Sequence, residues 1–169
     1  MSRLKDYMVP FITRQQIKKI VMSLAKQIDS DYEGQEIVLI CPLKGSVLFL
    51  ADLMRFLTTP VQVDFVHLIS KGSIQIVKDI TTNIEGKHVL IVEEIIDSGR
   101  KLTFLKKRLQ ASNPKSVKVI TFIDKPARRE IAVNPDYVGT VVEDRFLIGY
   151  GLDSEEVGRN YPDIYILNN

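Results

Sequence analysis

The chain has 169 residues, 45% of them hydrophobic, and a formal net charge of +2. This length is within the range of one domain and lets the chain bury about two thirds of its unfolded surface, so we expect a single domain over residues 1–169. The small net charge and the lack of a long basic run argue against nucleic acid as a partner. No apolar stretch approaches the ~18 residues of a membrane span, and the first residues lack the apolar core of a signal peptide. We therefore expect a cytoplasmic protein with no membrane partner.

The N-terminal part of the chain predicts a helix, a strand and a second helix. Thr13 and Gln16 form a capping-box pattern, and apolar residues from Ile17 to Ile28 then recur at helical spacing. The continuous apolar run Ile37–Cys41 predicts a strand that is buried on both faces, and its cysteine, the only one in the chain, is then a buried hydrophobe. A helix over residues 47–57 follows.

Further strands are expected at residues 61–65, 89–92 and 117–123, with a helix that begins near Gly99 and ends before Asn113. Strands that alternate with helices in this way favour an α/β fold, a mostly parallel twisted sheet flanked by helices.

The last third of the chain changes character. Short extended pieces at residues 137–142, 146–148 and 164–167 follow one another without helices and indicate a small hood. We place the core at about residues 13–142 and the hood in the N-terminal residues and about residues 143–169.

The most informative segment is the buried strand Val89–Val92, which runs into Glu93, Glu94 and then Asp97 before a Ser-Gly turn that opens a helix. Ligands of open α/β sheets bind at such strand ends. Backbone N–H groups at a helix N-terminus bind anions, so residues 97–101 are expected to hold a phosphate monoester. The paired glutamates suit sugar hydroxyls or a hydrated Mg²⁺ ion. Read as structure alone, the segment would be a solvated acidic helix cap.

This segment resembles the phosphoribosyltransferase family, whose motif is a strand, two acids, two aliphatic residues, Asp-Ser/Thr-Gly and a helix. Other segments narrow the resemblance to hypoxanthine-guanine phosphoribosyltransferases and cover nearly the whole chain. The resemblance implies a type I phosphoribosyltransferase fold, purine salvage, Mg²⁺ as cofactor, and a homodimer or homotetramer. It implies substrate contacts in the phosphate turn from Ser98, Gly99, Arg100 and Lys101.

For the leaving pyrophosphate, the resemblance points to Lys44 and Gly45, whose peptide in relatives is typically a non-proline cis bond, and to Arg159. Each of these residues taken singly would be an ordinary turn or a surface charge.

For the purine, Lys125 would donate to the 6-oxo group, because an ammonium has donors and no acceptor. Phe146 would stack on the base, the Leu147 backbone would bind its edge, and Asp153 would bind a second Mg²⁺. Without the other motifs, these residues read as an exposed lysine and a strand with a glycine bulge.

The implied reaction transfers phosphoribosyl from phosphoribosyl pyrophosphate to hypoxanthine, and to guanine, giving IMP or GMP and pyrophosphate. Asp97 would be the general base at purine N7. Glu93 and Glu94 would hold the ribose hydroxyls and, with them, the metal.

This sequence departs from the family pattern in three places. Glu94 stands where Asp is usual, and Lys101 replaces a Thr whose hydroxyl binds the 5-phosphate. The segment around Ser70–Ser73 is shorter than the usual mobile loop, whose closure excludes water. These departures keep open a second hypothesis, a nucleotide-sensing protein on the same scaffold with little or no activity. A transferase for another base would need a different group at Lys125, and the choice among hypoxanthine, guanine and xanthine stays open.

Overall fold

The computed structural model describes residues 7–168, and its centre is a six-stranded sheet of order β4-β3-β2-β5-β6-β7. Neighbouring strands are parallel, except that β3 and β4 form an antiparallel hairpin. The strands are β2 (Ile37–Leu43), β3 (Val61–Lys71), β4 (Ser73–Lys78), β5 (His88–Ile96), β6 (Ser116–Asp124) and β7 (Tyr137–Val141). The predicted α/β fold with a mostly parallel sheet is confirmed.

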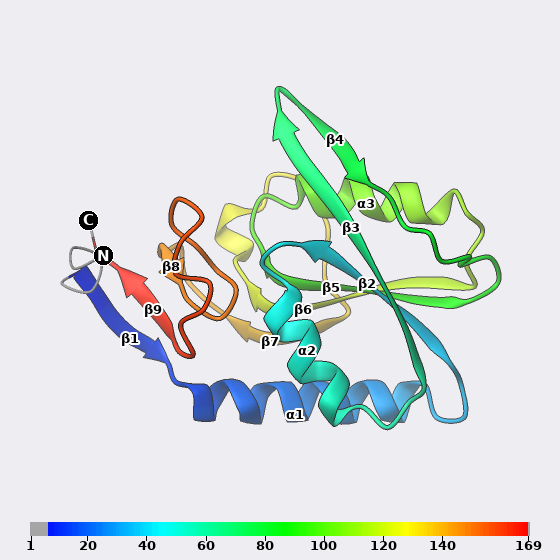
Figure 1. Ribbon diagram of the computed structural model, residues 1–169, viewed down its shortest axis with the longest axis horizontal. Coiled ribbons are helices and arrows are strands. Elements are labelled where there is room, and N and C mark those ends of the chain that lie inside the picture. The colour runs from blue at the N-terminus through cyan, green and yellow to red at the C-terminus, as the bar shows by residue number, and fades with distance from the viewer. Residues whose placement is uncertain (1–6, 169) are drawn as a thin grey trace.

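Helices cover both faces of this sheet (Figure 1). They are α1 (Arg14–Asp31), α2 (Val47–Phe56) and α3 (Arg100–Gln110), and a short 3₁₀ turn η2 spans Pro126–Arg128. Strand β2 lies inside the sheet with helices on both sides, which explains why its sequence is continuously apolar. Its residues Ile37 and Leu39 pack in the cluster that holds α1 and α2, whereas Val38 and Ile40 pack in the cluster that holds α3. Helix α1 begins with the predicted capping box of Thr13.

A second, three-stranded antiparallel sheet of order β1-β9-β8 forms the hood beside the main sheet (Figure 1). It consists of β1 (Met8–Ile12), β8 (Leu147–Ile148) and β9 (Ile164–Leu167). The two ends of the described chain meet in it, since the N–H of Asn168 donates to the carbonyl of Tyr7 at 3.0 Å. The hood therefore joins segments from opposite ends of the sequence.

Two extended segments differ from the prediction. The piece at residues 137–142 was described with the short hood pieces although the expected core ran to about residue 142; Tyr137–Val141 joins the main sheet as β7, in parallel register with β6. The strand expected at residues 61–65 continues to Lys71 and turns at Gly72, with φ of +73°, into β4, which was not predicted. This hairpin projects beyond the body of the sheet (Figure 1). No helix within residues 7–168 is long and apolar enough to cross a membrane.

Candidate active site

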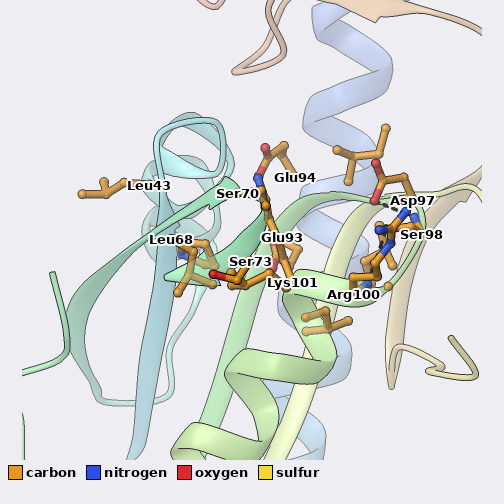
Figure 2. A pocket seen from close by; sticks show the side chains of 17 residues that line it. Leu43, Leu68, Ser70, Ser73, Glu93, Glu94, Asp97, Ser98, Arg100 and Lys101 are labelled. Carbon is orange, nitrogen blue, oxygen red and sulfur yellow. Dashed lines mark hydrogen bonds between the residues drawn. The ribbon is translucent and has the colours of Figure 1, made fainter. Parts of the chain in front are cut away.

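A cavity of about 710 Å³ lies at the carboxyl end of β5, where the strand leads into α3. Its wall contains the acidic pair of β5, the turn that follows and the first residues of α3, together with residues of the β3–β4 hairpin. In Figure 2, Asp97, Ser98 and Arg100 lie on one side and Leu68 and Ser73 of the hairpin on the other. The cavity brings together these predicted site residues: Glu93, Glu94, Asp97, Ser98, Gly99, Arg100 and Lys101.

The turn before α3 has the geometry of an anion site. Gly99 is the N-cap at φ of +80°, and a Cβ there would lie 2.6 Å from Cγ1 of Val133, so this position requires glycine. Gly99 has no side chain with which to cap the helix. The N–H of Ser98 is held by the Asp97 carboxylate at 2.6 Å, and the N–H of Arg100 contacts the Ser98 hydroxyl at 3.4 Å. The other N–H groups of the first helical turn have no intrahelical partner and are available to a phosphate.

A second cavity of about 380 Å³ adjoins the first, and Glu94, Ile95 and Asp97 line both. Its other lining residues include four that the sequence predicted for the purine and the second metal: Lys125, Phe146, Leu147 and Asp153. Asp97 therefore lies where the two cavities meet.

Lys125 is a buried cation in this second cavity. Its residue is 7% exposed, its ammonium donates to the carbonyl of Arg145, and burial lowers the pKa of its ammonium. The Arg145 carbonyl thus occupies one of the three donors of the Lys125 ammonium, and two are left for another acceptor. Phe146, by contrast with the buried Lys125, is 53% exposed, which leaves its ring open to contact from the cavity side.

Lys44, Gly45 and Arg159 line neither cavity. Gly45 lies against Glu94 in a tight contact between the main sheet and the hood, and the charge of Arg159 acts on Glu94. A Cβ on Gly45 would lie 2.1 Å from Oε1 of Glu94, and a Cβ on Gly151 would lie 2.0 Å from the Gly45 carbonyl oxygen. The cis peptide bond of this loop is Leu43–Lys44, one bond before the Lys44–Gly45 peptide at which the resemblance suggested it. The absence of side chains at both glycines lets the backbone of the loop after β2 touch the backbone of the hood loop, which is residues 149–163 between β8 and β9.

The hood loop carries a chain of ion pairs that reaches this contact. The Arg159 guanidinium pairs with Asp153 at 2.8 Å and with Glu156 at 3.3 Å, and it donates to the Gly151 carbonyl at 2.9 Å. Glu156 also pairs with the Lys44 ammonium at 2.8 Å. The hydrogen bond from Lys44 and that from Arg159 lower the pKa of the Glu156 carboxyl.

The paired glutamates at the end of β5 carry perturbed acidities. Burial, and then the neighbouring Glu94 carboxylate, raise the pKa of Glu93 well above its usual range, and the charge of Lys101 opposes this. Burial also raises the pKa of Glu94, against a hydrogen bond donated by the Ser46 hydroxyl. A cation beside the pair would relieve both effects.

These carboxylates suit Mg²⁺, which completes its ligand shell with water and substrate, better than they suit a metal ion bound only by protein ligands. Within residues 7–168 no three His, Cys, Asp or Glu side chains gather as a ligand cluster. Mg²⁺ usually takes one or two carboxylates and completes its shell with water and substrate phosphate oxygens. Glu93 and Glu94 supply such a pair, while Asp153 lines only the second cavity and forms an ion pair with Arg159.

Comparison with known proteins agrees with this arrangement. The model of the phosphoribosyl transferase domain family matches residues 12–155. The chain belongs to this family. Among curated phosphoribosyltransferases, it is 42% identical to the hypoxanthine-guanine phosphoribosyltransferase of Aquifex aeolicus, covering 92% of each chain. It is 38% identical to the bifunctional protein TilS/HprT of Listeria innocua, but it spans only 26% of that protein's length.

Solved phosphoribosyltransferase structures superpose closely. A hypoxanthine-guanine phosphoribosyltransferase of Bacillus anthracis is 43% identical, covers 95% of this chain and 97% of its own, and gives a TM-score of 0.92. A hypoxanthine phosphoribosyltransferase of Staphylococcus aureus gives 0.95 at 35% identity, covering 99% of this chain and 95% of its own. The predicted family and the hooded fold are therefore confirmed.

Sequence reasoning missed three polar residues of this phosphoribosyltransferase site. Ser46 holds Glu94, since its hydroxyl donates to the carboxylate and accepts from the Glu94 N–H at 3.2 Å. Arg129 forms a largely buried pair with Asp124 and donates to the carbonyl of Asp97. Glu156 bridges Lys44 and Arg159. Only Ser46 had a local signal, because it directly follows the Lys-Gly pair, whereas the other two act through contacts between distant segments.

Proposed function

We propose that the protein is a hypoxanthine-guanine phosphoribosyltransferase of purine salvage. It transfers the 5-phosphoribosyl group of phosphoribosyl pyrophosphate to hypoxanthine or guanine and releases IMP or GMP and pyrophosphate. The observation that carries the proposal is the meeting of the two cavities at Asp97, one lined by the phosphate turn and the other by Lys125 and Phe146. Such a pair of sites aligns a phosphorylated sugar and a base for direct reaction.

The first cavity binds the sugar phosphate. N–H groups of the turn from Asp97 to Lys101 hold the 5-phosphate, and the side chains of Arg100 and Lys101 border it. Glu93 and Glu94 bind the ribose hydroxyls, which a carboxylate accepts well. Lys101, in the place of a hydroxyl residue, contributes a point charge rather than a short directional hydrogen bond.

Selection of the base rests on Lys125. Its two remaining ammonium donors suit the 6-oxo oxygen of hypoxanthine or guanine and cannot accept from the 6-amino group of adenine. The exposed ring of Phe146 stacks on the purine, worth about 1–3 kcal/mol without selecting among bases. The Leu147 backbone contacts the purine edge.

Transfer requires a proton to leave the purine and charge to leave with the pyrophosphate. Asp97, between the two cavities, accepts the proton from N7 while N9 attacks the anomeric carbon. Lys44, the Gly45 amide and Arg159 stabilise the charge that grows on the leaving pyrophosphate. Glu93 and Glu94, and at a second position Asp153, would hold Mg²⁺, which would supply further electrostatic stabilisation of that charge when bound.

The decisive assay measures pyrophosphate release from phosphoribosyl pyrophosphate and Mg²⁺ with hypoxanthine, guanine, xanthine and adenine offered separately. Turnover with 6-oxopurines and none with adenine supports the proposal. Tight IMP binding without turnover on any base would instead support the nucleotide-sensing alternative, for which Lys101 and the short β3–β4 turn are the motivating features.

Two variants test the assigned roles. Asp97→Asn keeps the size but cannot take a proton, so we expect kcat to fall by about 10²–10⁴-fold with little change in KM. Lys125→Ala removes a charged hydrogen bond and should lower kcat/KM for hypoxanthine by about 10–100-fold. Lys107→Ala, an exposed lysine on α3 outside both cavities, is the matched control. Unchanged rates in both site variants would refute the assignment.

A further inference from the structure

Glu156 joins two cations that come from different parts of the fold. Its carboxylate Oε2 lies 2.8 Å from Nζ of Lys44, in the loop after β2, and 3.3 Å from a guanidinium nitrogen of Arg159, in the hood loop. A single carboxylate oxygen therefore contacts both side chains that the proposed function assigns to the leaving pyrophosphate. The contact spans 112 positions in sequence and exists only through the tertiary fold.

A tight turn fixes the backbone that presents this carboxylate. Glu155 and Glu156 both have positive φ, at +50° and +67°, which is uncommon for residues other than glycine. The Glu156 N–H donates to Oδ2 of Asp153 at 2.9 Å, and Ser154 and Val157 form a β-bridge across the turn. The backbone position of Glu156 is thus set independently of its side chain.

The side chain itself is free to leave. It is 63% exposed, and the Lys44 side chain is 55% exposed, so both groups can return to water at little desolvation cost. Exposed ion pairs of this kind are weak and compete poorly with a multiply charged anion. A pyrophosphate group carries several anionic oxygens and can engage both cations at once.

We propose that Glu156 is a displaceable counter-ion, whose carboxylate pairs with Lys44 and Arg159 until the pyrophosphate group of the substrate or product takes its place. This inference rests on the proposed function, because that function brings pyrophosphate to these two cations. Glu156 lowers the affinity for phosphoribosyl pyrophosphate and for free pyrophosphate alike. It also helps the product to leave, because the carboxylate returns to the cations as pyrophosphate departs.

The test compares Glu156→Gln with Glu155→Gln. Both variants remove one negative charge from the same turn, but the Glu155 carboxylate makes no ion pair within residues 7–168. Calorimetric titration with pyrophosphate and Mg²⁺ should show Kd about two- to tenfold lower in Glu156→Gln than in the wild type, the gain expected from removing one exposed ion pair, to Lys44, and one half-buried ion pair, to Arg159. A parallel titration with phosphoribosyl pyrophosphate should show the same factor, and Glu155→Gln should match the wild type.

Steady-state kinetics separate this role from a structural one. In Glu156→Gln, product inhibition by pyrophosphate should strengthen and KM for phosphoribosyl pyrophosphate should fall, while KM for hypoxanthine stays unchanged. Unchanged or weaker pyrophosphate binding in Glu156→Gln would overturn the inference, and so would an equal gain in affinity in both variants. The proposed function would stand in either case if the wild type turns over. A wild type that neither turns over nor binds pyrophosphate would overturn both.

Discussion

Removing one partner of the ion pair between Arg129 and Asp124 is expected to destabilise the fold at the site strongly. The two side chains are only 13% and 12% exposed, and Arg129 also donates to the carbonyl of Asp97. Replacing Arg129 with Met keeps the chain length but leaves the Asp124 carboxylate buried without its cation. Breaking a buried pair in this way costs about 3–5 kcal/mol, whereas an exposed pair is worth at most about 1 kcal/mol.

Urea unfolding of single and double variants measures this cost. With a slope of about 2 kcal/mol/M, a loss of about 4 kcal/mol moves the unfolding midpoint down by about 2 M. The double variant Asp124→Leu/Arg129→Met removes both charges, so it should be more stable than Arg129→Met alone, because apolar replacement of a whole buried pair is often nearly neutral. A loss below about 1 kcal/mol in Arg129→Met, or a double variant that loses the sum of the single losses, would refute this reasoning.

Two further predictions concern a glycine contact and an acid-sensitive turn. Gly151→Ala should lower the thermal unfolding midpoint and raise KM for phosphoribosyl pyrophosphate, because the added Cβ would lie 2.0 Å from the Gly45 carbonyl oxygen. Gly34→Ala is the control, because Gly34 also has a positive φ but a Cβ there would have no atom within 4 Å. Equal effects of the two substitutions would contradict a role for the contact. Burial alone would raise the pKa of Asp64, but hydrogen bonds from the N–H groups of Thr82, Thr81 and Phe65 outweigh it and hold the pKa well below its usual range. Since the folded-state pKa lies below the unfolded one, the stabilisation is complete above about pH 4 and is lost as pH falls toward the folded-state pKa, so urea titrations should show less loss of stability in acid for Asp64→Asn than for the wild type.

The regular elements that the sequence predicted are those with a strong local pattern. The capping box at Thr13 and the apolar run of β2 each carry their own structural signal, and both appear as expected. Strand β4 lacks such a signal, since most of its residues are exposed and it depends on pairing with β3. Strand β1 has three exposed residues, one of them Pro10, and it is an edge strand held by β9 from the other end of the chain. Neither of these two strand pairings can be predicted from a short stretch of sequence.

The same distinction applies to the site. The acids, the turn and the first residues of α3 are contiguous in sequence, so the motif predicted that they would lie together, and they line one cavity. Lys125 and Phe146 were assigned by resemblance to the family, and the fold brings both into the adjacent cavity. The partners that hold these residues were not predictable, because an Arg or Glu on a loop reads as a surface charge until a distant segment faces it. Arg129 and Glu156 are of this kind.

The substitution at Lys101 gains a physical rationale from the charges around it. Glu93 and Glu94 are adjacent and only partly exposed; desolvation raises the pKa of both carboxyls, and the charge of Glu94 adds to this for Glu93. The Lys101 ammonium opposes this for both carboxyls, which a threonine hydroxyl at the same position would do far less. A protonated glutamate loses acceptor capacity for ribose hydroxyls and for a metal ion, so a nearby cation that favours the ionised form also favours binding. Lys101 therefore does not by itself favour a sensor over an enzyme, because its charge supports the carboxylates on which the proposed transfer depends.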